Sequence, residues 1–286
     1  MPHLFQLSYL VKELVERHIV PPPKLSPTFG KIHSEIFQQV KLIPGDNEIR
    51  LKLHRSDPSF CLQAKTDVAY SIKIDKAVLF VKQHPIPPHI REAHAKVLEK
   101  QTMKFPVKHV EMKFFTKGST RPDLSEQNLV TGVLPRKCYI GLVDAEAFNG
   151  KITSNPFNFQ NFGVSEITLR ANGISVPYDK ISLDYESKKY DEGYFSLLQA
   201  SGLLYKNRGS TISYENFGNG YALYGFDLSS DPSPENQCLD LIQEGKLSLS
   251  ITLKTASTKA ITIVVYLEYD KLIEVDKDKN VTTNYE

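Results

Sequence analysis

The chain has 286 residues, of which 41% are hydrophobic, so it can bury a core as one large or two smaller domains, which excludes a disordered chain. Its formal net charge is only +2, which excludes a general attraction to nucleic acid. Basic residues prevail in 1–120 and acidic residues in 121–286; solvated strand faces explain this asymmetry, and a head-to-tail contact between copies is the alternative.

No apolar run approaches the roughly 20 residues that a membrane-spanning helix needs. Residues 1–20 carry Glu13 and Glu16 and lack the apolar core of a signal peptide, so we expect a protein that is neither secreted nor membrane-bound. Three cysteines lie far apart among apolar neighbours and form no CxxC motif: Cys61, Cys138 and Cys238. This pattern predicts buried free thiols, without disulfides or a zinc site.

The first segment has the spacing of an amphipathic helix. Apolar residues recur at intervals of three and four between His3 and His18: Leu4, Leu7, Val11, Leu14 and Val15. Three consecutive prolines, residues 21–23, then end any helix and predict a stiff, extended linker.

From Phe29 onward the pattern is that of β-strands. Alternating or continuous apolar runs predict strands at 47–55, 59–63, 68–74, 77–83, 107–115, 137–143, 220–228, 246–254 and 259–270. Residues 165–176 read as a hairpin, because Asn172-Gly173 tolerates the positive φ angles of a type I′ turn. In 107–115 the alternating side that carries Met112 and Phe114 is expected to face the core.

Short helices are expected only in connections, at 88–100, 190–200 and 236–243. Two connections, 84–104 and 177–220, are long, and connections of that length often contact a partner. Many short strands without a βαβ rhythm predict an all-β, antiparallel sandwich of the Greek-key or jelly-roll type.

The motifs of common catalytic sites are missing from the sequence: there is no GxSxG, P-loop, GxGxxG or HExxH. His89 and His94 would lie about 140° apart on a helix, which disfavours a shared metal. Asp144 and Glu146 follow a strand and are expected to form a polar turn. We therefore expect no catalytic residue, metal or cofactor and no specific nucleic-acid binding, although an enzyme whose carboxylates come together from distant positions stays open.

A phenylalanine-rich stretch is the one candidate site. It comprises Asn155, Pro156, Phe157, Asn158, Phe159 and Phe162. We expect a structural corner in which the rings pin the loop onto the sandwich. Contact with a neighbouring subunit is the alternative, and a ligand or carbohydrate site with exposed aromatic rings is a third interpretation.

Five blocks of sequence, in the same order, resemble the major capsid proteins of Polinton, or Maverick, elements, which are virus-like transposons. The blocks are 30–62, 77–116, 134–159, 219–231 and 264–281. The resemblance implies a double jelly-roll capsid protein that self-associates into homotrimeric capsomers and a capsid, in the virion or the host cell interior, and that has no catalytic residues.

The resemblance also implies a division of the chain. Residues 1–28 are the N-terminal helix and linker, 29–63 the end of a first jelly roll, 64–282 the second jelly roll and 283–286 a tail. Most of the first jelly roll is missing, so a truncated copy or a genome-integrated remnant is expected. A ligand- or carbohydrate-binding β-sandwich is the alternative function.

Overall fold

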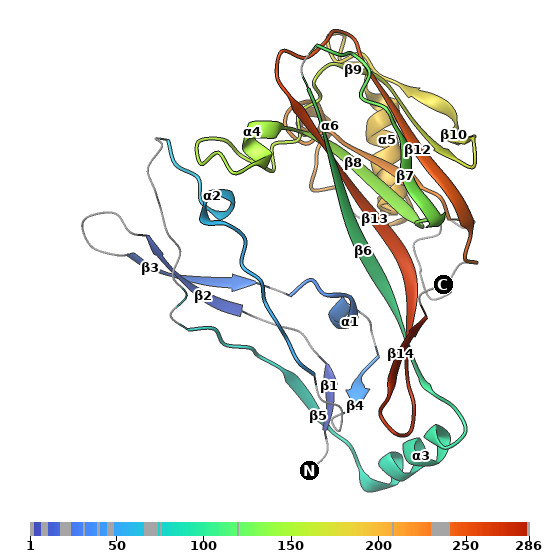
Figure 1. Cartoon of the computed structure of the whole chain (residues 1–286). Coiled ribbons are helices and arrows are strands. Elements are labelled where there is room, and N and C mark those ends of the chain that lie inside the picture. Colours follow the sequence, from blue (N-terminus) through green and yellow to red (C-terminus); the bar gives the residue numbers. More distant parts are fainter. Residues whose placement is uncertain are drawn as a thin grey trace. The chain divides into compact units, whose positions relative to one another are not determined.

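The computed structural model describes residues 3–6, 11–17, 24–30, 32–38, 41–44, 49–65, 74, 76–118, 120–207, 209–229 and 241–284. The chain forms two compact units (Figure 1). The smaller unit comprises 1–62, 67–109 and 271–285, and the larger unit comprises 63–66, 110–270 and 286. Two long strands, β6 (Met103–Lys117) and β13 (Ile261–Val275), contribute residues to both units.

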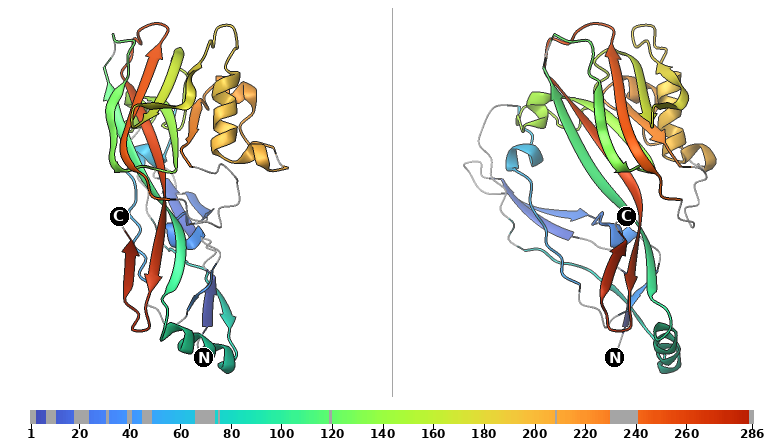
Figure 2. Two further views of the ribbon diagram at one scale, coloured as in Figure 1. Left: turned by 90° about the vertical axis from the view of Figure 1, so that its right-hand side faces the viewer. Right: turned by 45° about the vertical axis from the view of Figure 1, so that its right-hand side comes forward.

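The larger unit is built on eight strands in two sheets (Figure 2). In addition to β6 and β13, these are β7 (Glu126–Val133), β8 (Lys137–Asp144), β9 (Val164–Ala171), β10 (Ile174–Ser182), β11 (Leu223–Asp227) and β12 (Glu244–Leu253). One sheet has the order β10-β9-β12-β7; in the other, β11, β8 and β13 are neighbours and β6 also pairs with β13. Most consecutive strands alternate between the sheets, which is the connectivity of a jelly roll.

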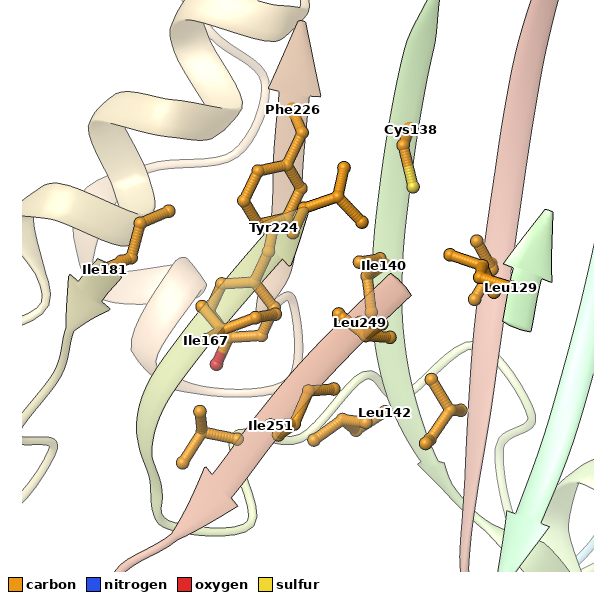
Figure 3. Close-up of a cluster of buried hydrophobic side chains, with 14 of the residues drawn as sticks. Leu129, Cys138, Ile140, Leu142, Ile167, Ile181, Tyr224, Phe226, Leu249 and Ile251 are labelled. Carbon is orange, nitrogen blue, oxygen red and sulfur yellow. The ribbon is translucent and has the colours of Figure 1, made fainter. Parts of the chain in front are cut away.

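The core of this unit lies between the two sheets (Figure 3). Alternate residues of the central strands face inward, as the period-two pattern predicts: Cys138, Ile140, Leu142, Leu247, Leu249, Ile251, Leu253, Ile261, Ile263, Val265 and Leu267. The predicted antiparallel sandwich and the predicted faces of β12 and β13 are confirmed.

The hairpin of β9 and β10 turns at Asn172 and Gly173, whose φ angles are +53° and +84°, as predicted for a type I′ turn. Asn172 also reaches the start of β12. Its Oδ1 accepts a hydrogen bond from the Lys246 backbone N–H at 2.9 Å, and its Nδ2 donates to the Glu244 carbonyl at 3.4 Å.

The smaller unit contains short elements. β1 (His3–Gln6) pairs with β4 (Ile43–Pro44) and β5 (Lys82–Pro85), and β2 (Val11–Arg17) pairs with β3 (Lys24–Gly30). The helices are α1 (Glu35–Gln38), α2 (Pro58–Cys61) and α3 (Pro88–Leu98), and β14 (Val281–Asn284) pairs with the end of β13. A small core packs β4 with the residues of β6 and β13 that belong to this unit: Ile43, Phe105, Val107 and Val275.

Several sequence-based predictions for the first hundred residues are wrong. The helix expected over 3–18 is replaced by β1 and β2, because short apolar runs fit either period and the hydrogen bonds of β3 favour a strand. Residues 49–57 form no strand, and Ile49, Leu51 and Leu53 are exposed. Residues 59–63 were expected to be extended, but Asp57 accepts a hydrogen bond from the Ser59 N–H and caps α2.

Other predictions for the elements have mixed outcomes. The helix at 88–100 and the helix at 190–200 are confirmed as α3 and α5 (Asp191–Ala200). The strand at 77–83 survives only as part of β5, and 241–243 are not helical. The proline linker, residues 68–73 and the rest of the third helix, 236–240, lie outside the described residues.

Candidate assembly surface

Two long connections leave the jelly roll at the same end. One joins β8 to β9 and contains α4 (Ala145–Phe148); the other joins β10 to β11 and contains α5, the turn η1 (Leu203–Tyr205) and α6 (Tyr214–Gly218). They share this end because Leu223, at the start of β11, pairs with Gly141, near the end of β8. The phenylalanine-rich corner lies in the first connection.

The corner begins with a side-chain turn. Asn155 Oδ1 accepts a hydrogen bond from the Phe157 N–H at 2.9 Å, and its carbonyl accepts from the Asn158 N–H at 3.2 Å. Pro156 is buried, whereas the Phe157 side chain is 57% exposed. The expectation that Phe157 helps to pin the loop onto the sandwich stays a prediction.

The second half of the corner is anchored to the sheet. Phe159 packs with Val143 and Val264 on the outer face, and its carbonyl accepts from the Ala222 N–H at 2.9 Å. Phe162 has a φ of +45° and packs against the main core. These two rings hold the loop in place, while Phe157 is left at the surface.

The outer face of the sheet that contains β6 and β13 carries an apolar strip, which we call the outer strip and define as Met112, Phe114, Phe148 and Tyr266. Phe148 and Tyr266 are half-buried. The exposed fractions of Met112 and Phe114 are 59% and 62%. The rings of Phe114 and Phe148 contact each other at a centroid distance of 5.3 Å, and Tyr266 meets Tyr139 edge-on at 5.9 Å.

The outer strip corrects the predicted orientation of β6. Met112 and Phe114 were expected in the core, but the alternate residues face inward. Phe115 packs against the main core, Lys113 Nζ donates to the Leu129 carbonyl at 3.0 Å, and Lys117 pairs with Glu126 at 3.1 Å. The long lysine chains lie along β7 with their charges at its edge. The side of β6 that carries the lysines is therefore the one that β7 partly covers.

Tyrosines fix the second connection to the jelly roll. The Tyr185 and Tyr224 hydroxyls are hydrogen-bonded at 2.7 Å, and Tyr190 stacks on Tyr214 at a centroid distance of 4.4 Å. Burial raises the pKa of both Tyr185 and Tyr224. Phe217 meets the ring of Tyr224 edge-on at 5.9 Å, so α5 and α6 form a packed layer rather than a loose loop.

Asp144 and the cysteines are further residues that the sequence singles out. Asp144 caps α4 by accepting from the Glu146 N–H at 2.9 Å, which confirms the polar turn. Within the described part of the chain, no group of His, Cys, Asp and Glu has the arrangement of a metal site. Cys138 is buried as predicted, Cys61 is exposed against prediction, and Cys238 lies outside the described residues. None of the described helices has the length and hydropathy to cross a membrane.

The fold is thus that of an antiparallel jelly roll of the kind found in viral capsid proteins. The PBCV-1 virus capsid superposes with a TM-score of 0.52 and 8% identity over 92% of this chain and 71% of that chain. The Sputnik virophage structure matches with a TM-score of 0.48 and 13% identity over 94% of this chain and 58% of that chain. At these identities the likeness concerns the fold alone.

Comparison of sequences adds a distant relative. A Caenorhabditis elegans protein described as "Uncharacterized protein F54H12.2" is 24% identical over 257 residues, which are 88% of this chain and 61% of that protein. No family model matches the chain. The chain therefore spans less than two thirds of the length of the worm protein and of the virophage chain.

Proposed function

We propose that the chain is a structural capsid protein of the Polinton or Maverick type, or a genome-integrated remnant of one, that self-associates into homotrimeric capsomers. The observation that carries the proposal is the eight-stranded jelly roll, a fold shared with the PBCV-1 capsid chain. The five collinear blocks of resemblance support the specific family. The protein would act in the virion or in the interior of the host cell.

In this proposal the jelly roll of residues 64–282 corresponds to the second one of a double jelly-roll protein. All eight strands, β6 to β13, lie within that range, which supports the assignment. Residues 29–63 would be the end of the first jelly roll, 1–28 an N-terminal segment and 283–286 a tail.

The outer strip is the surface that we assign to self-association. Met112 and Phe114 are large apolar side chains on one strand, and among the described residues each stays more than half exposed. Stable interfaces bury about 1,600 Å² around a dehydrated apolar centre. Phe157 and the corner around it supply a second exposed aromatic group on the same unit.

The experiment is light scattering coupled to size exclusion, over a range of protein concentrations. We expect the wild type to be trimeric, and Phe114→Ser to be monomeric but still folded. Ile174→Ser is the matched control, because Ile174 is equally apolar and exposed but lies on the other sheet. A wild type that is folded and monomeric at every concentration would refute self-association.

A ligand- or carbohydrate-binding module is the second candidate, and the exposed ring of Phe157 is the observation that favours it. Aromatic rings at the surface can stack on sugar faces. A glycan array probed with the wild type and with Phe157→Ala tests this function. Binding that is lost in the variant would support it, and an array without any bound glycan would reject it.

A further inference from the structure

Three charged residues meet in register on neighbouring strands of the jelly roll. Lys137 on β8 lies opposite Asp227 on β11 and opposite Glu268 on β13. Lysine and aspartate are rarely buried together, yet the side chains of Lys137 and Asp227 are only 7% and 5% exposed. Desolvation of two unlike charges is expensive unless hydrogen bonds satisfy both.

Each member of the pair is oriented by other groups. Lys137 Nζ donates to the carbonyl of Ala200, at the end of α5, at 2.7 Å, and the Tyr139 hydroxyl donates to the same oxygen at 2.8 Å. Asp227 Oδ1 accepts from the Ser229 N–H at 3.0 Å and from the Ser229 hydroxyl. These contacts hold the amine and the carboxyl group side by side.

The contact between the two groups is not a good ion pair. Asp227 Oδ2 lies 3.9 Å from Lys137 Nζ, and among the described residues it has no hydrogen-bond partner. Charge-assisted hydrogen bonds are typically about 2.7–2.9 Å long. Amide formation requires a neutral amine and a carboxylic acid, so the ammonium proton must first pass to the carboxylate. A neutral amine is a nucleophile, and fixed proximity raises its effective concentration.

We propose that Lys137 and Asp227 form an intramolecular isopeptide bond, with Glu268 as the proton carrier. The Lys137 Nζ electron pair adds to the Asp227 carboxyl carbon and forms the N–C bond. Glu268 accepts a proton from Nζ and passes it to one carboxyl oxygen. The C–O bond then breaks and one water leaves, so no oxidant or cofactor is needed.

The position of Glu268 fits this role. The strand register places Glu268, on β13, directly opposite Lys137, on β8. The Glu268 backbone carbonyl accepts from the Arg136 N–H at 2.7 Å, which fixes the strand at that point. The pKa of Tyr139 is raised by burial and then by the charges of Glu268 and Asp227, as expected if both carboxyl groups lie near the same hydroxyl. The bond would replace two buried charges with one amide and would tie β8 covalently to β11.

Mass spectrometry of the intact, denatured full-length chain tests the proposal without reference to assembly. The wild-type mass should be lower than the sequence mass by the mass of one water, and tandem spectra should show a branched peptide that joins Lys137 to Asp227. A wild type with the full sequence mass, or a water loss that maps elsewhere, would overturn the bond.

Variants separate the roles of the three residues. Asp227→Ala and Lys137→Ala should restore the full mass, relative to the wild type, whether or not they fold. Glu268→Gln keeps the shape and both reacting groups, so the water loss should disappear or slow at least tenfold. Unchanged bond formation in Glu268→Gln would refute its role as proton carrier, and Glu268→Asp should recover part of the rate.

Discussion

Replacing Gly141 with alanine tests how tightly the corner is held against the jelly roll. A Cβ at this position would lie 2.6 Å from Phe159 Cδ1 and 2.9 Å from Leu223 Cδ2. Favourable contacts between carbon atoms require about 3.5–4.0 Å, so the Phe159 ring must move. Overpacking of this kind destabilises a protein by about 1–3 kcal/mol.

Phe159→Ala removes the ring that the new methyl group would meet. A fully buried Phe→Ala change costs about 3–5 kcal/mol, and Phe159 is only partly buried, so we expect about 2 kcal/mol. In the double variant the methyl group occupies part of the space of the ring. The destabilisation of the double variant should therefore be smaller than the sum of the two single destabilisations by about 1–2 kcal/mol.

The assay is urea unfolding followed by far-ultraviolet circular dichroism, because the chain has no tryptophan. The four proteins of the cycle are the wild type, Gly141→Ala, Phe159→Ala and the double variant. Phe157→Ala in place of Phe159→Ala is the matched control, since that ring is mostly exposed, and its effect should be additive with Gly141→Ala. Additivity within about 0.5 kcal/mol in the Phe159 cycle would refute the packing argument.

Three other outcomes follow from burial and charge. Phe157→Ala should lower the unfolding free energy by less than about 0.5 kcal/mol but weaken any trimer, as light scattering would show; an unfolded variant would contradict this. The Ser187 hydroxyl and then its N–H hold the pKa of Asp184 below 3.8, so the stabilisation is full above that pH and lost as the pH falls through the folded pKa. The melting temperatures of wild type and Asp184→Asn should therefore converge as the pH falls below 3.8, and a constant gap between them would contradict this stabilisation. With Cys238 replaced by Ser, native protein should react with a thiol reagent at exposed Cys61, whereas burial raises the pKa of Cys138 and should delay its reaction until unfolding.

The sequence predicts the fold most accurately where the pattern within a single strand or turn is enough to determine its structure. The serines and threonine of β12 alternate with leucines that the other sheet covers, so its register and face follow from a period of two. The turn at Asn172-Gly173 is equally local. The periodicity cannot say which side of β6 is covered, because Met112 and Phe114 alternate with Phe115 and with lysines long enough to lie along β7.

Long-range contacts explain the remaining errors in the fold and the site. Residues 49–53 alternate as a strand should, but they have no partner strand among the described residues, and alternation alone forms no sheet. In the corner, three similar rings have different environments because Phe159 meets Gly141 and Phe162 meets the main core, while Phe157 is more than half exposed. The group of Lys137, Asp227 and Glu268 is likewise assembled only by strand pairing.

The side chain of Asn172 has a consequence beyond its own turn. A glycine there would satisfy the same backbone angles, so Asn172→Gly looks neutral for the hairpin. It would, however, remove the amide that meets Glu244 and Lys246 where β12 begins. A slip of β12 by a single residue would carry Leu247 and Leu249 from the core to solvent. This one side-chain amide thus helps to fix the register of β12 against its neighbour.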